Sequence, residues 1–110
     1  MMHEVTLKRL FREYLMNKCG ITYATAISYT SYLNKVSKLL KDYKLINKDI
    51  YKIRDLHRLL QAKIDAESLD EFYIMNSKSH NQCSCSLNHY YDFAATVDEF
   101  SHKWKNSLIY

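Results

Sequence analysis

The sequence has 110 residues, 47% of them hydrophobic, which is enough for a single domain over residues 1–110 with a core that needs no disulfides. Its net charge is +4, and no run of about 18 apolar residues is present that could span a bilayer. The charged start also lacks the apolar block of a signal peptide, so we expect a cytoplasmic protein with no membrane partner.

Glycine and proline, the strongest turn signals, are almost absent, and this narrows the possible fold classes. The chain contains one glycine and no proline, too few turn signals for a protein of strands and hairpins. We therefore predict a compact all-α bundle of four to five helices. The three cysteines, two of them in a Cys-x-Cys pair, fit free thiols in a reducing compartment better than a secreted disulfide framework.

The first predicted helix covers residues 6–18. Its apolar face has helical spacing and consists of Leu7, Leu10, Phe11, Tyr14 and Leu15. Gly20 follows and suits the left-handed conformation that ends many helices. Thr22 is a typical N-cap for the next helix, because its hydroxyl can accept from a first-turn amide. The short link predicts that the first two helices pack antiparallel.

The long helix predicted over residues 22–43 is the expected axis of the fold. Apolar residues at spacings of three and four form one stripe along it: Ala26, Tyr29, Leu33, Val36, Leu40 and Tyr43. Lys35, Lys38 and Lys41 lie away from this stripe. The main structural element is therefore also a candidate binding element.

A third main helix is predicted after a turn at residues 44–48. Ile50 and Ile53 indicate one short helical turn, and Asp55 can cap the helix that follows and ends near Ala66. We expect its apolar face to consist of Leu56, Leu59, Leu60 and Ile64.

The carboxyl-terminal part of the chain contains one more helix of clear periodicity. The apolar cluster at residues 72–75 predicts a buried helical turn, and the polar stretch 76–86 predicts an exposed loop. The last helix is expected to begin near Ser84 or Ser86 and to continue to Trp104.

Charge is distributed unevenly between the two parts of the chain. Residues 1–63 contain thirteen Lys or Arg against five Asp or Glu, a balance of +8, whereas residues 64–110 contain three against seven, a balance of −4. This asymmetry favours an anionic partner on the amino-terminal side, although charge alone does not separate nucleic acid from an acidic protein surface.

Basic residues on the first two helices form the candidate nucleic-acid surface: Lys8, Arg9, Arg12, Lys35, Lys38 and Lys41. Cations on adjacent helices can neutralise several phosphates, which makes affinity depend steeply on salt. The alternative is an ordinary solvated face, which helical proteins commonly carry. Tyr23 and Tyr32 lie off the main stripe and can stack on bases, fill a partner's pocket or pack at the core's rim.

One cluster of potential metal ligands stands out, with the pattern H-x2-C-x-C-x3-H: His80, Cys83, Cys85 and His89. Thiolates and imidazoles suit tetrahedral zinc. However, Cys-x-Cys lacks the usual spacing of two to four residues between zinc-binding cysteines, so free thiols in a polar loop are the favoured interpretation. We predict no metal and no cofactor.

A family resemblance is carried mainly by the second predicted helix, in the segment TAISYTSYLNKVSKLL. Its pattern T-x-x-x-Y-x-x-x-L-x-x-hydrophobic, at Thr25, Tyr29, Leu33, Val36 and Leu40, resembles that of the core-binding domain of tyrosine recombinases (phage integrases). FREYL at 11–15 is similar to the family's first helix and SCSLNHYYDFA at 84–94 to its last, so the resemblance covers residues 7–97.

The resemblance implies a small SAM-like helical bundle that clamps double-stranded DNA. It implies DNA contacts from the start of the second helix, at Thr22, Tyr23, Thr25 and Ser28. It also implies contacts from the last loop and helix, at Lys78, Ser84, Ser86 and Asn88. The family's catalytic arginine, His-x-x-Arg and nucleophilic tyrosine belong to a separate unit that this sequence does not contain.

We predict that the chain is not an enzyme. His57, beside Arg58 and near Asp55, is best interpreted as an exposed helical histidine, because no paired carboxylates or serine nucleophile stand at a suggestive spacing. A single glycine also excludes a glycine-rich phosphate loop.

Two functions from different classes follow. The first is a non-catalytic DNA-binding module, acting as an accessory or regulatory protein of a phage or other mobile element. The second is a small protein-interaction factor that inhibits a host nuclease or defence system, placing its basic, tyrosine-rich surface on an acidic or nucleic-acid-binding protein surface. A homodimer is a third possibility, because aromatic residues circle the last helix widely: Tyr90, Tyr91, Phe93, Phe100 and Trp104.

Overall fold

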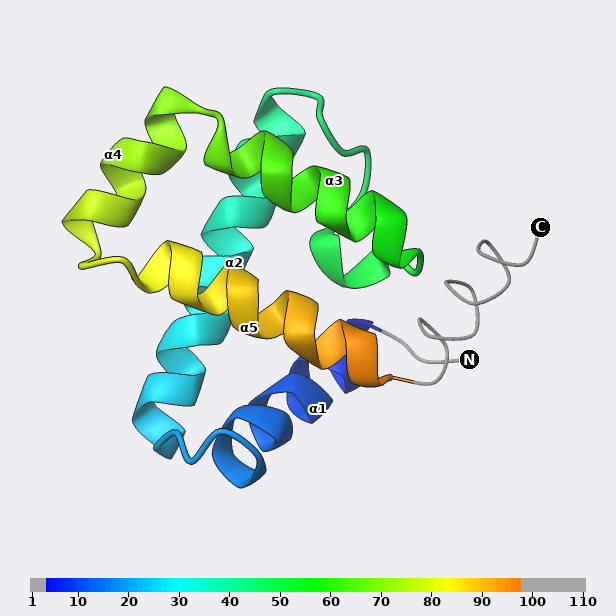
Figure 1. Ribbon diagram of the computed structural model, residues 1–110, viewed down its shortest axis with the longest axis vertical. Helices are drawn as coiled ribbons and strands as arrows, with labels where there is room; N and C mark the ends of the chain where they lie inside the picture. Colours follow the sequence, from blue (N-terminus) through cyan, green and yellow to red (C-terminus); the bar gives the residue numbers. More distant parts are fainter. Residues whose placement is uncertain (1–3, 98–110) are drawn as a thin grey trace.

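A computed structural model describes residues 4–97, which fold into five α-helices and one short 3-10 helix (Figure 1). The elements are α1 (Glu4–Asn17), α2 (Tyr23–Asp42), η1 (Ile50–Lys52), α3 (Leu56–Glu67), α4 (Asp70–Lys78) and α5 (Gln82–Thr96). No strand occurs within residues 4–97. The predicted all-α class and the compact helical bundle are therefore confirmed.

The turn between α1 and α2 has the structure that Gly20 and Thr22 predict. Gly20 takes the left-handed conformation with φ +68°, and the Ile21 amide donates to the Leu15 carbonyl at 3.0 Å, which closes the turn. Thr22 caps α2 by accepting from the Thr25 amide at 3.3 Å. The two helices leave this turn in opposite general directions and pack against each other, as predicted (Figure 1).

Helix α5 lies across α2 and contacts all four other α-helices (Figure 1). Its Tyr90 is fully buried at the centre of an aromatic cluster. The rings of Phe11 from α1 and Tyr51 from η1 meet Tyr90 edge to face, with centroids 5.2 and 5.1 Å away. Phe93 lies 5.5 Å from Phe11 on the same side. Edge-to-face aromatic packing is favourable, so this cluster ties three distant segments together.

The apolar stripe predicted on α2 is buried over most of its length. Four of its members are fully buried: Ala26, Leu33, Val36 and Leu40. Tyr29 is half-buried against the core. Tyr43, which we expected in the same stripe, is 46% exposed because α2 ends at Asp42 and the chain turns away.

The predicted loop over residues 76–86 is wrong. Helix α4 continues to Lys78 and α5 begins at Gln82, so only residues 79–81 connect them. His80 and Asn81 both have positive φ, at 55° and 68°, and this pair reverses the chain.

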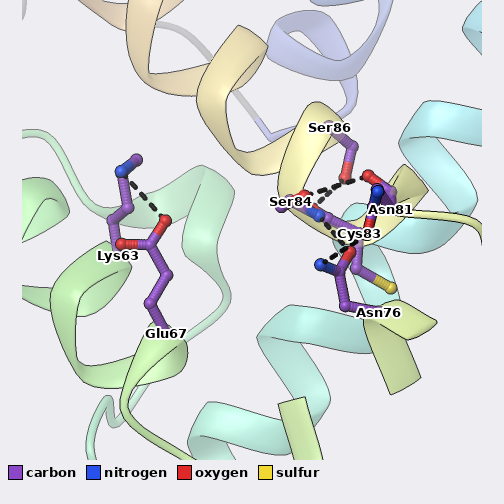
Figure 2. A network of polar contacts seen from close by, with 7 residues as sticks. All are labelled: Lys63, Glu67, Asn76, Asn81, Cys83, Ser84 and Ser86. Atoms are coloured by element: carbon purple, nitrogen blue, oxygen red, sulfur yellow. Dashed lines mark hydrogen bonds and ion pairs between the residues drawn. The ribbon is translucent and has the colours of Figure 1, made fainter. Parts of the chain in front are cut away.

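Polar side chains that resemble loop residues in the sequence act here as helix caps. The Asn76 side-chain oxygen accepts from the Ser84 amide at 2.9 Å, reaching from α4 to the first turn of α5 (Figure 2). The Ser79 hydroxyl oxygen accepts from the Cys83 amide at 3.4 Å. Both bonds satisfy amides that have no partner within the helix, which explains how so polar a stretch supports two helix ends.

Three apolar residues expected in the core face solvent instead. On α3, Ile64 is 50% exposed, because it lies off the buried side of that helix, which consists of Leu56, Leu59, Ala62 and Ala66. On α4, Tyr73 and Ile74 are 72% and 51% exposed. Only Phe72 of the predicted buried cluster lies in the core.

The aromatic residues of the last helix are mostly explained by the fold. Tyr90 and Phe93 are buried, and Tyr91 is half-buried against the core. Phe100 and Trp104, and with them the predicted extension of the helix to residue 104, lie outside the described residues. A homodimer stays a prediction, and the buried pair gives it no support.

Replacing Gly20 with alanine tests the left-handed turn. A Cβ at Gly20 would meet no atom within 4 Å, so the only penalty is the backbone conformation. We expect Gly20→Ala to lower the free energy of unfolding by about 1 kcal/mol, measured by urea denaturation. Gly20→Asn is the matched control and should lose less, because asparagine tolerates this conformation. Equal losses for both variants would contradict the assignment.

The hydroxyl of Tyr90 gives a second stability test. Burial raises the pKa of this hydroxyl, and none of the protein groups that the structure describes forms a hydrogen bond with it. We therefore expect Tyr90→Phe to leave the free energy of unfolding unchanged or about 1 kcal/mol higher. Tyr90→Ala should lower it by about 3–5 kcal/mol because it removes the central ring. A large loss in Tyr90→Phe would mean that the hydroxyl is bonded.

Candidate nucleic-acid interface

Basic side chains of α2 and α4 meet at one pocket. Lys35 and Lys78 line an open cavity of about 220 Å³, together with Tyr32, Met75 and Ser79. None of these five residues is acidic. Within the described part of the chain neither lysine forms an ion pair. Two uncompensated ammonium groups at one cavity form a site suited to an anion.

Local contacts hold the groups of this Lys35–Lys78 pocket in place. Lys35 Nζ lies over the Tyr32 ring, 5.1 Å from its centroid, in a cation–π contact. Lys78 is the last residue of α4, where the helix dipole favours a cation. The Ser79 hydroxyl is already occupied by the Cys83 amide, so it forms part of the wall.

Helix α4 is anchored by three interactions that fix its side of the pocket. Phe72 is buried in the core, and the Asn76 side chain caps α5. At the other end of α4, the Tyr43 hydroxyl donates to the Glu71 carboxylate at 2.5 Å. This hydrogen bond raises the pKa of Tyr43, because ionisation of the hydroxyl would place two negative charges side by side.

A second basic pocket lies between α1 and the first turn of α2. It has a volume of about 200 Å³ and is lined by Arg9, Arg12, Glu13, Met16 and Tyr23. Arg9 lies 3.9 Å from Glu13, which compensates part of its charge. Arg12 pairs with no acidic side chain in residues 7–97, and Tyr23 is 65% exposed beside it. This pocket brings together three of the predicted contact residues, but with an acidic group among them.

Other predicted contact residues are engaged within the fold. Lys8 Nζ lies over the Tyr51 ring, 5.3 Å from its centroid. Lys38 pairs with Asp42 at 3.1 Å. Thr25 donates its amide to the α2 cap and its hydroxyl accepts from Thr22 at 3.1 Å. These positions are therefore less available for phosphates than Lys35 and Lys78.

Lys41 is engaged as well, at the far end of α2. It forms an ion pair with Asp49 at 2.8 Å and lines an open cavity of about 370 Å³ with Lys44, Ile46 and Asn47. The hydrogen bond from Lys41 holds the pKa of the Asp49 carboxyl below its usual range, against the opposing effect of burial. The charge of Lys41 is thus largely directed at this carboxylate.

The four potential zinc ligands do not converge. Cys83 is buried with its Sγ toward a carbonyl of α4, and His80 is exposed in the reversal before α5. Cys85 and His89 share another face of α5, where His89 Nδ1 lies 3.9 Å from Cys19 Sγ. Among the side chains of residues 7–97, no three His, Cys, Asp or Glu residues form a group able to hold a metal ion.

In place of a zinc site, the structure assembles a cluster of thiols, an imidazole and phenols. The Tyr29 ring stacks on His89 with centroids 5.6 Å apart. Burial raises the pKa of both Tyr14 and Tyr29, and a neighbouring thiol adds to the effect: Cys19 for Tyr14 and Cys85 for Tyr29. Sequence spacing gives no signal for this cluster, because its members come from four separate segments.

The residues that the recombinase resemblance implies as DNA contacts differ in their exposure and in their hydrogen bonds. Ser86 is fully buried and its hydroxyl donates to the Cys83 carbonyl at 3.0 Å, so a contact with DNA is wrong for this residue (Figure 2). Ser84 donates to the Asn81 carbonyl at 3.0 Å. Asn88 is exposed on α5, and Ser28 is half-buried on α2.

Comparison with known proteins finds no match: the chain fits no family model, and no curated protein or solved structure matches it significantly. In the part of the chain that the structure describes, no helix combines the length and apolar character needed to cross a membrane. The chemistry of the pockets is therefore the basis for assigning a function.

The ion pair between Lys41 and Asp49 predicts that the free energy of unfolding depends on pH. Because the folded pKa of Asp49 is depressed, its pair with Lys41 stabilises the protein at neutral pH, and this contribution is lost as the pH falls through that pKa. Both side chains are about two-fifths exposed, so the effect is small. We expect Asp49→Asn to lower the free energy of unfolding by less than about 1 kcal/mol at neutral pH. The difference should vanish once the pH is low enough to protonate Asp49 in both the folded and the unfolded protein. A constant difference across this range would contradict the assignment.

Proposed function

We propose that the chain is a non-catalytic DNA-binding module that contacts phosphates of duplex DNA through the Lys35–Lys78 pocket. The resemblance of residues 7–97 to the recombinase core-binding domain supports this role, as does the all-α bundle. We propose further that the module acts as an accessory or regulatory factor of a phage or other mobile element.

The observation that carries the proposal is the convergence of Lys35 and Lys78 at one cavity without an acidic neighbour in its lining. The two residues come from different helices, so a shared pocket is not a consequence of helical spacing. An exposed lysine without an ion pair can neutralise a phosphate without first giving up a carboxylate partner. Lys38 and Lys41, by contrast, would have to leave Asp42 and Asp49.

The number of available cations sets the expected strength of binding. With Lys35, Lys78 and Arg12 as phosphate contacts, the logarithm of the association constant should fall with the logarithm of salt with a slope of about −3. Binding of this kind is weak, with dissociation constants of roughly 10⁻⁴ to 10⁻⁶ M. Phosphate contacts also carry no sequence information, so we expect no strong preference among duplex sequences.

The double variant Lys35→Gln with Lys78→Gln tests the proposal directly. We expect it to weaken binding to duplex DNA at low salt and to reduce the salt slope by about two, because two phosphate contacts are lost. The measurement is a salt titration of binding by fluorescence anisotropy with a labelled duplex.

Arg58→Gln is the matched control, since Arg58 is exposed near the start of α3 and forms no ion pair with any described side chain. It removes one charge away from the pocket and should leave the salt slope unchanged. The proposal is wrong if the wild-type protein binds no duplex at low salt, or if Arg58→Gln weakens binding as much as a single pocket substitution does.

A second candidate function is binding to a protein partner, favoured by the surface of α4. Tyr73 and Ile74 are neighbours on this helix and are 72% and 51% exposed. Aromatic residues such as tyrosine are enriched in protein interfaces, and Ile74 adds apolar surface next to Tyr73. In this role the protein would inhibit a host nuclease or defence system, with α4 as the contact element.

Substituting both residues separates this candidate from DNA binding. Tyr73→Ser with Ile74→Ser should abolish capture of the partner from a host lysate and leave duplex binding intact. Since both side chains are exposed, we expect little change in the free energy of unfolding, within about 0.5 kcal/mol. Capture that is unaffected by this pair would contradict the assignment to α4.

A further inference from the structure

We propose that the Lys35–Lys78 pocket receives an unstacked base of single-stranded DNA, which takes the place of the Lys35 ammonium over the Tyr32 ring while Lys35 and Lys78 bind its phosphate. This proposal rests on the part of the proposed function that places DNA phosphates at Lys35 and Lys78. It deepens it by naming the part of the nucleic acid that enters the pocket.

The composition of the pocket matches a nucleotide better than a bare phosphate. Tyr32 and Met75 supply an apolar wall made of an aromatic ring and a thioether, and Lys35 and Lys78 supply positive charge at the same cavity. A base has a flat, polarisable face that stacks on aromatic side chains, and its attached phosphate is anionic. Tyr32 and Met75 also pack against the core, and a phosphate alone would use the two ammonium groups without contacting the exposed parts of these two side chains.

The size of the cavity limits what can enter. Sites that enclose a drug-sized molecule or a cofactor have volumes of roughly 300 to 1,000 Å³. The Lys35–Lys78 pocket, at about 220 Å³ and open to solvent, is smaller. It therefore suits a single base that stays attached to its strand. A base inside a duplex is stacked and paired, so the preferred ligand is a single strand or an unpaired region.

Two hydrogen-bonding side chains at or next to the pocket are already satisfied by the protein. The Ser79 hydroxyl accepts from the Cys83 amide, and the Asn76 side chain accepts from the Ser84 amide. These bonds occupy the first amides of α5, which would otherwise be available for a phosphate or a base edge. Binding should consequently depend on stacking and charge and should tolerate any base.

The wild-type protein alone permits a first test. Oligo(dT) is compared with an abasic oligonucleotide of the same length, which keeps the phosphates and lacks the bases. We expect oligo(dT) to bind about tenfold more tightly, in the range measured for one base stacked on an aromatic side chain. Equal affinities would overturn the proposal, because phosphates alone would then account for binding.

Substitutions at Tyr32 provide the second test. Tyr32→Phe keeps the ring and should bind oligo(dT) as the wild type does. Tyr32→Leu keeps an apolar side chain without an aromatic face, and should lose most of the preference for oligo(dT) over the abasic strand, a ratio that a general loss of phosphate binding would not change. Thermal denaturation of both variants verifies that they fold; if Tyr32→Leu does not fold, the comparison of intact and abasic strands decides.

The outcomes separate this proposal from the proposed function. If duplex binding depends on Lys35 and Lys78 but the abasic strand and oligo(dT) bind with equal affinity, the phosphate site is supported and the base pocket is contradicted. If oligo(dT) binds through Tyr32 and duplex DNA does not bind, the proposed duplex function falls and the base pocket stands. Absence of binding to any of these nucleic acids overturns both.

Discussion

The edge-to-face contacts of Tyr90 with Phe11 and Tyr51 are the interaction on which the rest of the bundle depends. They join α5 to α1 and η1, and α5 also contacts the three other helices. Because α4 is capped onto the start of α5 by Asn76, the position of α5 determines where α4 ends. The aromatic cluster therefore influences the position of Lys78 indirectly: it fixes α5, and α5 fixes the end of α4 through the Asn76 cap.

Net charge does not predict which basic side chains are available to bind a phosphate. The amino-terminal excess of positive charge is real, yet Lys38 and Lys41 are paired with carboxylates and Lys8 lies over an aromatic ring. The pairs are exposed and each contributes little to stability, but they lower the local potential that a phosphate would experience. The pocket of Lys35 and Lys78 differs because no acidic side chain lines it.

Local signals in the sequence predict much of the fold, and tertiary contacts determine most of the site. Gly20 and Thr22 act as predicted because left-handed turns and N-caps depend on one or two residues. The polar stretch around Asn76 was wrongly predicted as a loop, since its side chains are caps whose partners belong to another helix. Lys35 and Lys78 were both predicted as contacts, but no spacing rule places them at one pocket.

An NMR titration of the labelled protein with duplex DNA tests the central claim most directly, because it reports on individual residues without substitution. We expect the signals of Lys35 and Lys78 to shift together and to return as salt is added, while those of the exposed α4 residues Tyr73 and Ile74 stay in place. Shifts confined to Tyr73 and Ile74, or shifts spread evenly over all lysines, would contradict a phosphate site built by α2 and α4.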